Sequence, residues 1–247
     1  MTALRTSGIS MRYGSLVALN GVDLEVAAGA RHALIGPNGA GKTTLINVLS
    51  GAIAPTGGDV YLHDERITML PQHLRARRGL TRTFQVTQLF PELTVLESIA
   101  LAILEREGRG WRWWPPVARF EAQLAEAHAL MERLGLESDA SRRVGRLPYG
   151  RQRLVEIALG LAANPRVLLL DEPAAGIPSG ESADVLGVVA DLPRDVTIVF
   201  IEHDMDLVFR FAERVTVLVA GRVLIEGSPD EIARDEHVRA VYLGREA

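Results

Sequence analysis

The sequence predicts an α/β fold: a mostly parallel sheet with an N-terminal antiparallel β subdomain and an inserted helical lobe. Two short apolar runs, residues 167–170 and 196–201, are bounded by polar residues and separated by the helical pattern "ESADVLGVVADL". Such runs are typical of buried parallel strands joined by crossover helices. Near the N-terminus, "VDLEV" at residues 22–26 alternates with a period of two, which indicates a strand with one buried face.

The helical lobe is expected at residues 85–151, which contain the long helical patterns "LTVLESIALAILERE" and "ARFEAQLAEAHALMERLG" with no strand-like run between them. Residues 1–84 and 152–247 are expected to form the α/β core with the antiparallel β subdomain, so that the chain makes one domain overall. Toward the C-terminus, "RVTVLVAGRVLIEG" predicts a hairpin that turns at Ala220 and Gly221, and "SPDE" is typical of a helix start.

The composition argues against several classes of protein. A chain of 247 residues without cysteine has no structural disulfides, no cysteine-ligated zinc and no thiolate catalysis. The formal net charge of -4 argues against general binding of nucleic acid. The N-terminus lacks the apolar segment of a signal peptide and the longest apolar runs are too short to span a bilayer, so we expect a soluble protein inside the cell.

Four arginines, Arg75, Arg77, Arg78 and Arg82, cluster within eight residues. On a helix, a run of this kind most often forms a solvated face, and a functional basic patch is the less common alternative. We therefore expect these four side chains to face solvent.

Residues 36–44, "GPNGAGKTT", match the phosphate-binding pattern G-x-x-x-x-G-K-[ST] and lie between a predicted strand, "RHALIG", and a predicted helix. Glycines in such a loop let successive backbone N–H groups converge on phosphate oxygens, and the helix N-terminus adds a partial positive charge. The predicted nucleotide contacts are Gly36, Pro37, Asn38, Gly39, Ala40, Gly41, Lys42, Thr43 and Thr44. The alternative is a glycine-rich turn with an incidental lysine.

Lys42 is the only lysine, and arginine supplies the other 26 of the 27 basic residues. A compact ammonium on a thin stem reaches the β and γ phosphates inside a narrow loop, where the planar fork of arginine is too wide. The hydroxyl of Thr43 is a predicted Mg²⁺ ligand. The loop therefore predicts a nucleoside triphosphate bound with Mg²⁺.

Acidic and histidine side chains follow two further predicted strands. "RVLLLDEP" places Asp171 and Glu172 at a strand tip, where Asp171 is predicted to hold Mg²⁺ through water and Glu172 to deprotonate the attacking water. The strand at residues 196–201 runs into "EHD", which brings His203 to the same sheet edge, the edge at which open α/β folds bind ligands. We expect His203 to contact the γ-phosphate. An acidic pair that caps the next helix and a helix-start histidine are the alternatives.

The ordered set of motifs resembles the ATP-binding cassette (ABC) family over nearly the whole chain. A guanine-specific protein is disfavoured because its Asn-Lys-x-Asp motif would need a second lysine. The resemblance implies the P-loop (RecA-like) form of the fold and hydrolysis of ATP. "MRYGSLVALNGVDLEV" is similar to the family's adenine loop, with Tyr13 as the stacking platform. "RTFQ" is similar to its glutamine loop, which implies that Gln85 is a catalytic residue and senses Mg²⁺, and His203 corresponds to its switch histidine.

The signature segment departs from the family pattern Leu-Ser-Gly-Gly-Gln. It reads "LPYGR" at residues 147–151, and Pro148 offers neither a hydroxyl nor a backbone N–H to a phosphate. Leu147, Gly150 and Gln152 remain the expected contacts, at a helix N-terminus, to nucleotide held by a second subunit.

These departures resemble one branch of the family, the ATPases of branched-chain amino-acid importers (high-affinity Leu/Ile/Val type) and their relatives for amides such as urea. The shared motifs are "YG" at 149–150, "EPAAG" at 172–176, "IEHDM" at 201–205 and "YLG" at 242–244. The resemblance implies integral-membrane permease subunits as partners, which hold the chain in the cytoplasm at the inner face of the plasma membrane. It also implies a second ABC ATPase subunit, in a heterodimer or a homodimer, and an indirect periplasmic or extracellular substrate-binding protein.

Two other functions stay open. The altered signature is compatible with a module that dimerises with nucleotide and hydrolyses little of it. A non-transport ABC ATPase of the DNA-repair type would interrupt the cassette with a long coiled coil, and no sustained heptads are present.

The three tryptophans of the chain, Trp111, Trp113 and Trp114, all lie in "RGWRWWPP". Amphipathic rings beside arginines suit a surface that faces a membrane or a permease. Packing of the rings on their own lobe is the alternative.

Overall fold

The structure is a computed structural model that describes residues 1–83, 89–108 and 120–243. Three predictions therefore fall wholly or partly outside it: Gln85, the tryptophan segment at 111–114 and the last residue of the "YLG" motif.

The central sheet has six strands in the order β10-β9-β3-β8-β7-β6. Their bounds are β3 Arg31–Ile35, β6 Leu80–Arg82, β7 Val167–Asp171, β8 Thr197–Ile201, β9 Arg214–Val219 and β10 Arg222–Gly227. All neighbours run parallel except β10, which pairs antiparallel with β9. The mostly parallel sheet is confirmed, and the last two strands form the hairpin that was predicted to turn at Ala220 and Gly221.

A second sheet is antiparallel and has the order β2-β1-β4-β5. Its strands are β1 Thr2–Tyr13, β2 Leu16–Ala27, β4 Gly57–Leu62 and β5 Glu65–Arg66. The "VDLEV" motif lies in β2, where Val22, Leu24 and Val26 are buried and the two acidic residues between them are exposed. The alternation therefore gives one buried face, as predicted for the antiparallel β subdomain.

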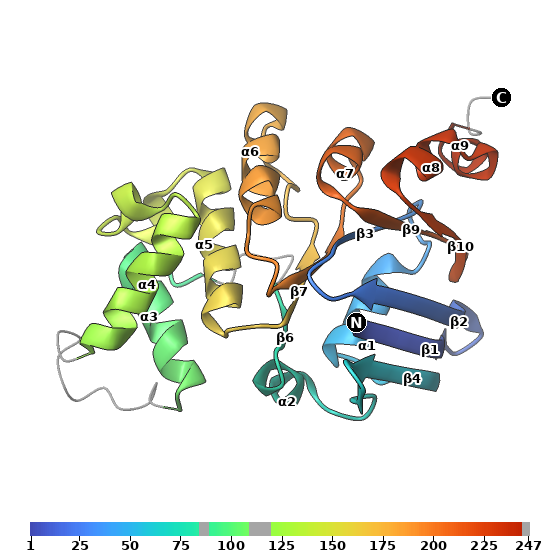
Figure 1. The fold of residues 1–247 in the computed structure, drawn as a ribbon, viewed down its shortest axis with the longest axis horizontal. Helices are drawn as coiled ribbons and strands as arrows, with labels where there is room; N and C mark the ends of the chain where they lie inside the picture. The colour runs from blue at the N-terminus through green and yellow to red at the C-terminus, as the bar shows by residue number, and fades with distance from the viewer. Residues whose placement is uncertain (84–88, 109–119, 244–247) are drawn as a thin grey trace.

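The helices are α1 Lys42–Ser50, α2 Gln72–Arg77, α3 Val95–Arg106, α4 Glu121–Arg133, α5 Tyr149–Ala162, α6 Ser179–Ala190, α7 Met205–Phe211, α8 Pro229–Arg234 and α9 Glu236–Leu243. Helix α8 starts with a capping box between Ser228 and Glu231, which confirms the helix start predicted from "SPDE". Figure 1 shows α3, α4 and α5 together at one end of the molecule and the antiparallel sheet at the other. Within the described residues, no helix has the length and apolar character needed to cross a membrane.

The central sheet is buried on both faces, because alternate residues of each strand belong to different cores. In β7, Leu168 and Leu170 pack with the helices α3 to α9, whereas Val167 and Leu169 pack with α1 and the antiparallel sheet. Full burial of one such side chain contributes about 1.5–3 kcal/mol. The two cores hold the carboxyl ends of β3, β7 and β8 at one edge, where the predicted site residues follow.

The expectation that the four clustered arginines face solvent is wrong for two of them. Arg75 is fully buried and donates to the carbonyl oxygens of Val48 and Leu49, each at 2.7 Å, where α1 ends. Its guanidinium thus satisfies acceptors that a helix C-terminus leaves unpaired. Arg82 lies on β6 with a side chain that is only 9% exposed, and it belongs to the site described next.

Candidate nucleotide-binding site

The predicted phosphate-binding loop connects β3 with α1 and is closely packed at both ends. A Cβ atom at Gly36 would lie 2.1 Å from the carbonyl oxygen of Leu218, and a Cβ at Gly41 would lie 2.6 Å from that of Ala18. Both distances are far below van der Waals contact, so only glycine fits. Gly39 has open space around it but a φ of +80°, a conformation that residues with a side chain rarely adopt.

The N-terminus of α1 is open to an anion. The helix has Gly41 as its N-cap, no side-chain cap and no acidic residue in its first turn. The first N–H groups of a helix have no acceptor within it, and the macrodipole adds a partial positive charge there. These groups therefore form an anion site of the kind predicted for phosphate.

Lys42, the first residue of α1, is folded into the loop. Its side chain is almost fully buried, and Nζ donates to the carbonyl oxygens of Gly36 at 2.7 Å and Pro37 at 3.1 Å. Burial lowers the pKa of the ammonium, and the carboxylates of Glu172 and Asp171 offset part of that effect. The ammonium thus occupies a narrow space close to both carboxylates.

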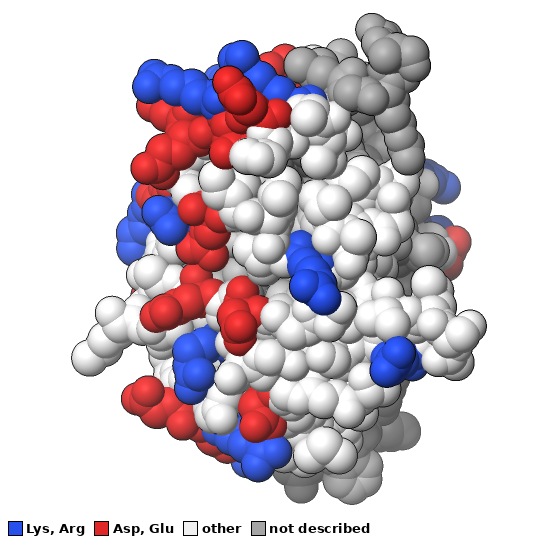
Figure 2. All heavy atoms as spheres, turned by 90° about the vertical axis from the view of Figure 1, so that its right-hand side faces the viewer, with Lys and Arg blue, Asp and Glu red and all other residues white. Residues whose placement is uncertain are grey.

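A cavity of about 330 Å³ opens beside the loop. Ten of the predicted site residues line it: Tyr13, Asn38, Gly39, Ala40, Gly41, Lys42, Thr43, Thr44, Glu172 and His203. Leu16, Val17 and Ala18 complete the wall, and Tyr13, Leu16 and Val17 are exposed hydrophobic side chains of the β1–β2 hairpin. Figure 2 shows the side of the molecule on which the antiparallel sheet lies, and most of its surface is uncharged. The wall thus offers an apolar platform next to an anion site.

Asp171 has one carboxylate oxygen paired and one free. Its side chain is fully buried; Oδ2 accepts from Arg82 at 2.7 Å, whereas Oδ1 is a buried acceptor without a hydrogen-bond partner among the described residues. Arg82 also donates to the side-chain oxygen of Asn47 on α1. A buried acceptor without a donor is costly, by about 1–3 kcal/mol, and a cation or its water shell removes that cost. Together with the exposed Thr43, which lines the cavity, the oxygen donors fit Mg²⁺.

Glu172 and His203 meet at the cavity. Oε1 of Glu172 lies 3.0 Å from Nε2 of His203, which follows β8. Glu172 has a φ of +51°, in the left-handed region, where a residue with a side chain is strained by about 1–3 kcal/mol. Its N–H donates to the carbonyl oxygen of Ile201 at 3.1 Å, which ties this backbone to β8.

Two buried charged residues that the sequence did not single out support this backbone. Arg153 on α5 donates to the carbonyl oxygen of Glu172 at 2.7 Å and to that of Pro173 at 3.2 Å. Glu202, next to the histidine, accepts the N–H of Ala174 at 2.8 Å, and burial raises the pKa of its carboxyl group. Arg153 also pairs with Glu156, and both are buried. No local signal distinguished Arg153, because it follows Arg151 and Gln152 at the polar start of the helix.

The signature residues lie away from this cavity. Leu147, Gly150 and Gln152 are not among its lining residues in the described chain. The Leu147 side chain is buried in the core, and its carbonyl oxygen accepts from Gln152 Nε2 at 2.9 Å. Gly150 is in the first turn of α5, where a Cβ would lie 3.0 Å from a carboxylate oxygen of Glu181. The signature segment therefore contributes nothing to the wall of the cavity in its own chain.

The chain matches two family models. The model described as ABC transporter matches residues 19–175, and the model described as branched-chain amino acid ATP-binding cassette transporter matches residues 222–247. Among curated proteins, the branched-chain amino acid transport ATP-binding protein BraF of Pseudomonas aeruginosa is 41% identical, over 98% of this chain and 97% of the relative. The corresponding protein LivG of Escherichia coli is 40% identical, with the same two coverages.

Solved structures are similar over the whole chain as well. The ADP conformation of MJ1267, an ATP-binding cassette of an ABC transporter, has a TM-score of 0.87 and 33% identity and covers 99% of both chains. A nucleotide-free ATP-binding cassette has a TM-score of 0.85 and 32% identity and covers 98% of this chain and 99% of its own. The open phosphate loop, the paired carboxylates and the full-length matches agree: the chain belongs to the ABC transporter family, as an ATP-binding and ATP-hydrolysing cassette.

Proposed function

We propose that the chain hydrolyses Mg²⁺-bound ATP to drive the import of branched-chain amino acids or related amino acids and amides. The observation that carries the proposal is the convergence of Lys42, Glu172 and His203 on one cavity, beside the free oxygen of Asp171. The cargo class is supported by the similarity to BraF and LivG, which are branched-chain amino acid transport proteins, and by the match at residues 222–247.

In this proposal the loop and the first turn of α1 hold the phosphates through backbone N–H groups, while the Lys42 ammonium exchanges its carbonyl contacts for phosphate oxygens. Tyr13, with the apolar side chains beside it, supplies a face for the adenine ring. Thr43 and Asp171 hold Mg²⁺, which neutralises charge on the phosphates when it is bound. Gln85, which lies outside the described residues, is the third proposed Mg²⁺ ligand beside Thr43 and Asp171.

Glu172 is the proposed general base. Its carboxylate takes a proton from the water that attacks the γ-phosphorus, and the bond between that phosphorus and the oxygen bridging to the β-phosphate breaks. The hydrogen bond at 3.0 Å between Glu172 and His203 fixes the direction of the carboxylate. Release of this bond would let the imidazole reach the γ-phosphate.

The signature residues serve a different nucleotide. Because Leu147, Gly150 and Gln152 do not line the chain's own cavity, we assign them to ATP held by a second cassette. They lie where the helical lobe at 85–151 ends and α5 begins. Pro148 removes one hydroxyl and one N–H from that contact. A partner cassette of different sequence would offset this loss, which favours a heterodimer over a homodimer.

The proposed assembly places the cassette in the cytoplasm against two integral-membrane permease subunits, with a substrate-binding protein on the other side of the membrane. The test is purification of the chain from its native membranes, followed by reconstitution of the complex in vesicles. Leucine, isoleucine or valine, added with the binding protein, is expected to stimulate ATP hydrolysis. If none of these three stimulates hydrolysis while basal hydrolysis is intact, branched-chain amino acids are excluded as the cargo. The assignment as an ATPase is then unaffected.

A further inference from the structure

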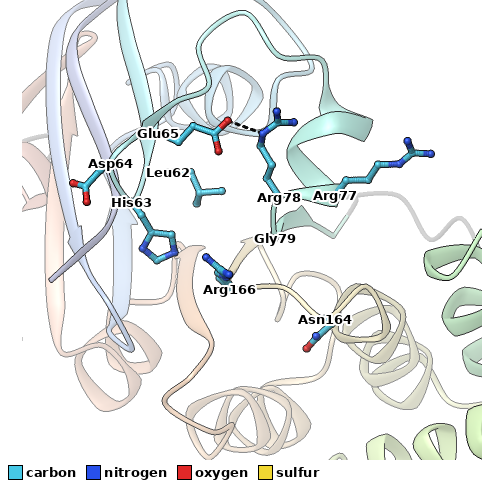
Figure 3. Close-up of a pocket in the computed structure, with 9 residues that line it drawn as sticks. All are labelled: Leu62, His63, Asp64, Glu65, Arg77, Arg78, Gly79, Asn164 and Arg166. Atoms are coloured by element: carbon cyan, nitrogen blue, oxygen red, sulfur yellow. Dashed lines mark hydrogen bonds and ion pairs between the residues drawn. The ribbon is translucent and has the colours of Figure 1, made fainter.

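A second cavity lies at the opposite end of the parallel strands from the phosphate loop. It has a volume of about 590 Å³ and is lined by the β4–β5 turn, the end of α2 and the turn that leads into β7 (Figure 3). Two of the lining residues are Gly79, immediately before β6, and Arg166, immediately before β7. None of the predicted nucleotide contacts lines this cavity.

The charges at this cavity are not balanced locally. Arg77, Arg78 and Arg166 line it, against the carboxylates of Asp64 and Glu65. Glu65 is already paired with Arg78 at 2.7 Å. Figure 3 shows the Asp64 carboxylate pointing away from Arg166. In the part of the chain that the structure describes, the side chains of Arg77 and Arg166 have no hydrogen bond or ion pair, and the three arginines exceed the two carboxylates by one positive charge.

His63 adds a buried polar atom without a partner. Within the described part of the chain its Nε2 has no hydrogen bond, and Figure 3 shows the imidazole ring pointing toward Arg166. The residue also has a φ of +52°, in the left-handed region, at the turn between β4 and β5. Buried atoms that lack a partner and strained turn residues both occur where a protein holds a ligand.

The close packing of the surrounding backbone fixes the position of Arg166. The carbonyl oxygen of Gly79 accepts both the N–H of Arg166 at 2.8 Å and the N–H of Val167 at 2.9 Å. A Cβ at Gly79 would lie 3.2 Å from Cγ of Arg166, so the stem of the arginine runs directly over the glycine. The backbone from which this arginine projects is therefore fixed at the edge of the central sheet.

We propose that this cavity binds a phosphate group, held by Arg166 and the imidazole of His63 with Arg77 at the rim. The guanidinium of Arg166 has no acceptor among the described residues, and the imidazole of His63 beside it donates as well when Nε2 carries the proton. An anion between them would accept from both, and guanidinium forks match the geometry of phosphate oxygens. The volume exceeds the need of inorganic phosphate, so a phosphate ester with a small organic part fits as well. The site is separate from ATP hydrolysis and does not rest on the proposed function.

The test is a titration followed by NMR of the histidine side chains, in a Lys42→Ala background that removes phosphate binding at the nucleotide site. The probes are inorganic phosphate and phenyl phosphate, which distinguish a site for free phosphate from a site for an ester. The expected result is a saturable shift of the His63 ring at millimolar concentration. Arg166→Gln is expected to weaken this binding at least about tenfold, equivalent to ~1.4 kcal/mol.

Arg194→Gln is the matched control, because Arg194 is an exposed arginine that does not line the cavity. The Arg194→Gln protein is expected to bind both probes with the same affinity as the Lys42→Ala background protein. Both Arg166 and Arg194 are on the surface. Thermal unfolding is to be measured for each variant, to check that it is folded. A His63 ring that does not shift with either probe overturns the proposal, and so does equal binding by the Arg166→Gln and Arg194→Gln proteins.

Discussion

The guanidinium of Arg153 on α5 and the backbone carbonyl of Glu172 are joined by a hydrogen bond of 2.7 Å. Arg153 lies three residues after Gly150 of the signature segment, in the same helix. A buried side chain thus connects the helix that we assign to a partner's nucleotide with the strained backbone of the proposed general base. Movement of α5 would be transmitted to Glu172 by this contact.

Arg153→Gln is expected to slow ATP turnover by up to about 10²-fold, the scale for small displacements of a catalytic group. The affinity for ATP is expected to change little, because Arg153 does not line the nucleotide cavity. Steady-state hydrolysis and equilibrium binding of ATP separate the two effects.

The single substitution also leaves Glu156 buried without its partner, which costs about 3–5 kcal/mol of stability. The double variant Arg153→Gln, Glu156→Gln removes both charges and is the appropriate comparison if the single variant unfolds. Arg143→Gln, which breaks an exposed ion pair with Glu92, serves as the control. Normal turnover by the folded double variant would show that Arg153 does not position Glu172.

Glu202→Gln is expected to stabilise the protein at neutral pH. Burial raises the pKa of Glu202 above its ordinary value of 4.5, so between that value and the raised pKa this carboxyl group binds more protons in the folded state than in the unfolded state. Stability is therefore lost as pH rises from about 4.5 through the raised pKa. A glutamine oxygen can still accept the N–H of Ala174. Thermal unfolding from pH 4 to pH 8 should show an advantage for the variant that grows with pH, and a constant difference would contradict this reasoning.

Lys42→Arg tests whether shape or charge is required in the phosphate loop. Lys42 is 6% exposed and folded against two carbonyl oxygens, a space that a planar guanidinium does not fit. We expect ATP binding to weaken at least about tenfold, ~1.4 kcal/mol, in both Lys42→Arg and Lys42→Ala. Calorimetric titration measures this, and an arginine variant with unchanged affinity would mean that charge alone suffices.

Asp171→Asn is expected to abolish the Mg²⁺ dependence of ATP binding and to destabilise the fold. The amide leaves the buried Arg82 guanidinium without its counter-charge, at a cost of about 3–5 kcal/mol. Adding Arg82→Met removes that charge, so the double variant should recover stability but not the Mg²⁺ dependence. ATP titrations with and without Mg²⁺ that still differ in the double variant would exclude Asp171 as the metal residue.

The sequence predicted those features that depend on local backbone. Gly36 and Gly41 follow from the spacing of the phosphate-loop pattern, β7 and β8 from continuous apolar runs, and α8 from the residues of its capping box. Each of these patterns lies within a few residues. Because carboxyl ends of parallel strands meet at one edge, the same local patterns also predicted that Glu172 and His203 would lie close together.

The buried charged residues could not be predicted in this way, because their partners are distant in sequence. Arg82 pairs with Asp171 across 89 positions, and Arg75 reaches the end of α1 across 26 and 27 positions. A cluster of arginines looks the same in the sequence whether its members face solvent or cap a helix inside the protein. Glu202 was likewise overlooked beside His203, since only the tertiary structure reveals its bond to Ala174.

The central claim is that Glu172 activates water for ATP hydrolysis while Lys42 and the loop bind the nucleotide. Glu172→Gln keeps the size of the side chain and removes the base. The most direct measurement is the single-turnover rate of Mg²⁺-ATP hydrolysis by this variant, together with its ATP affinity. We predict a rate lower by about 10² to 10⁴ with unchanged affinity. A near-normal rate would contradict the account.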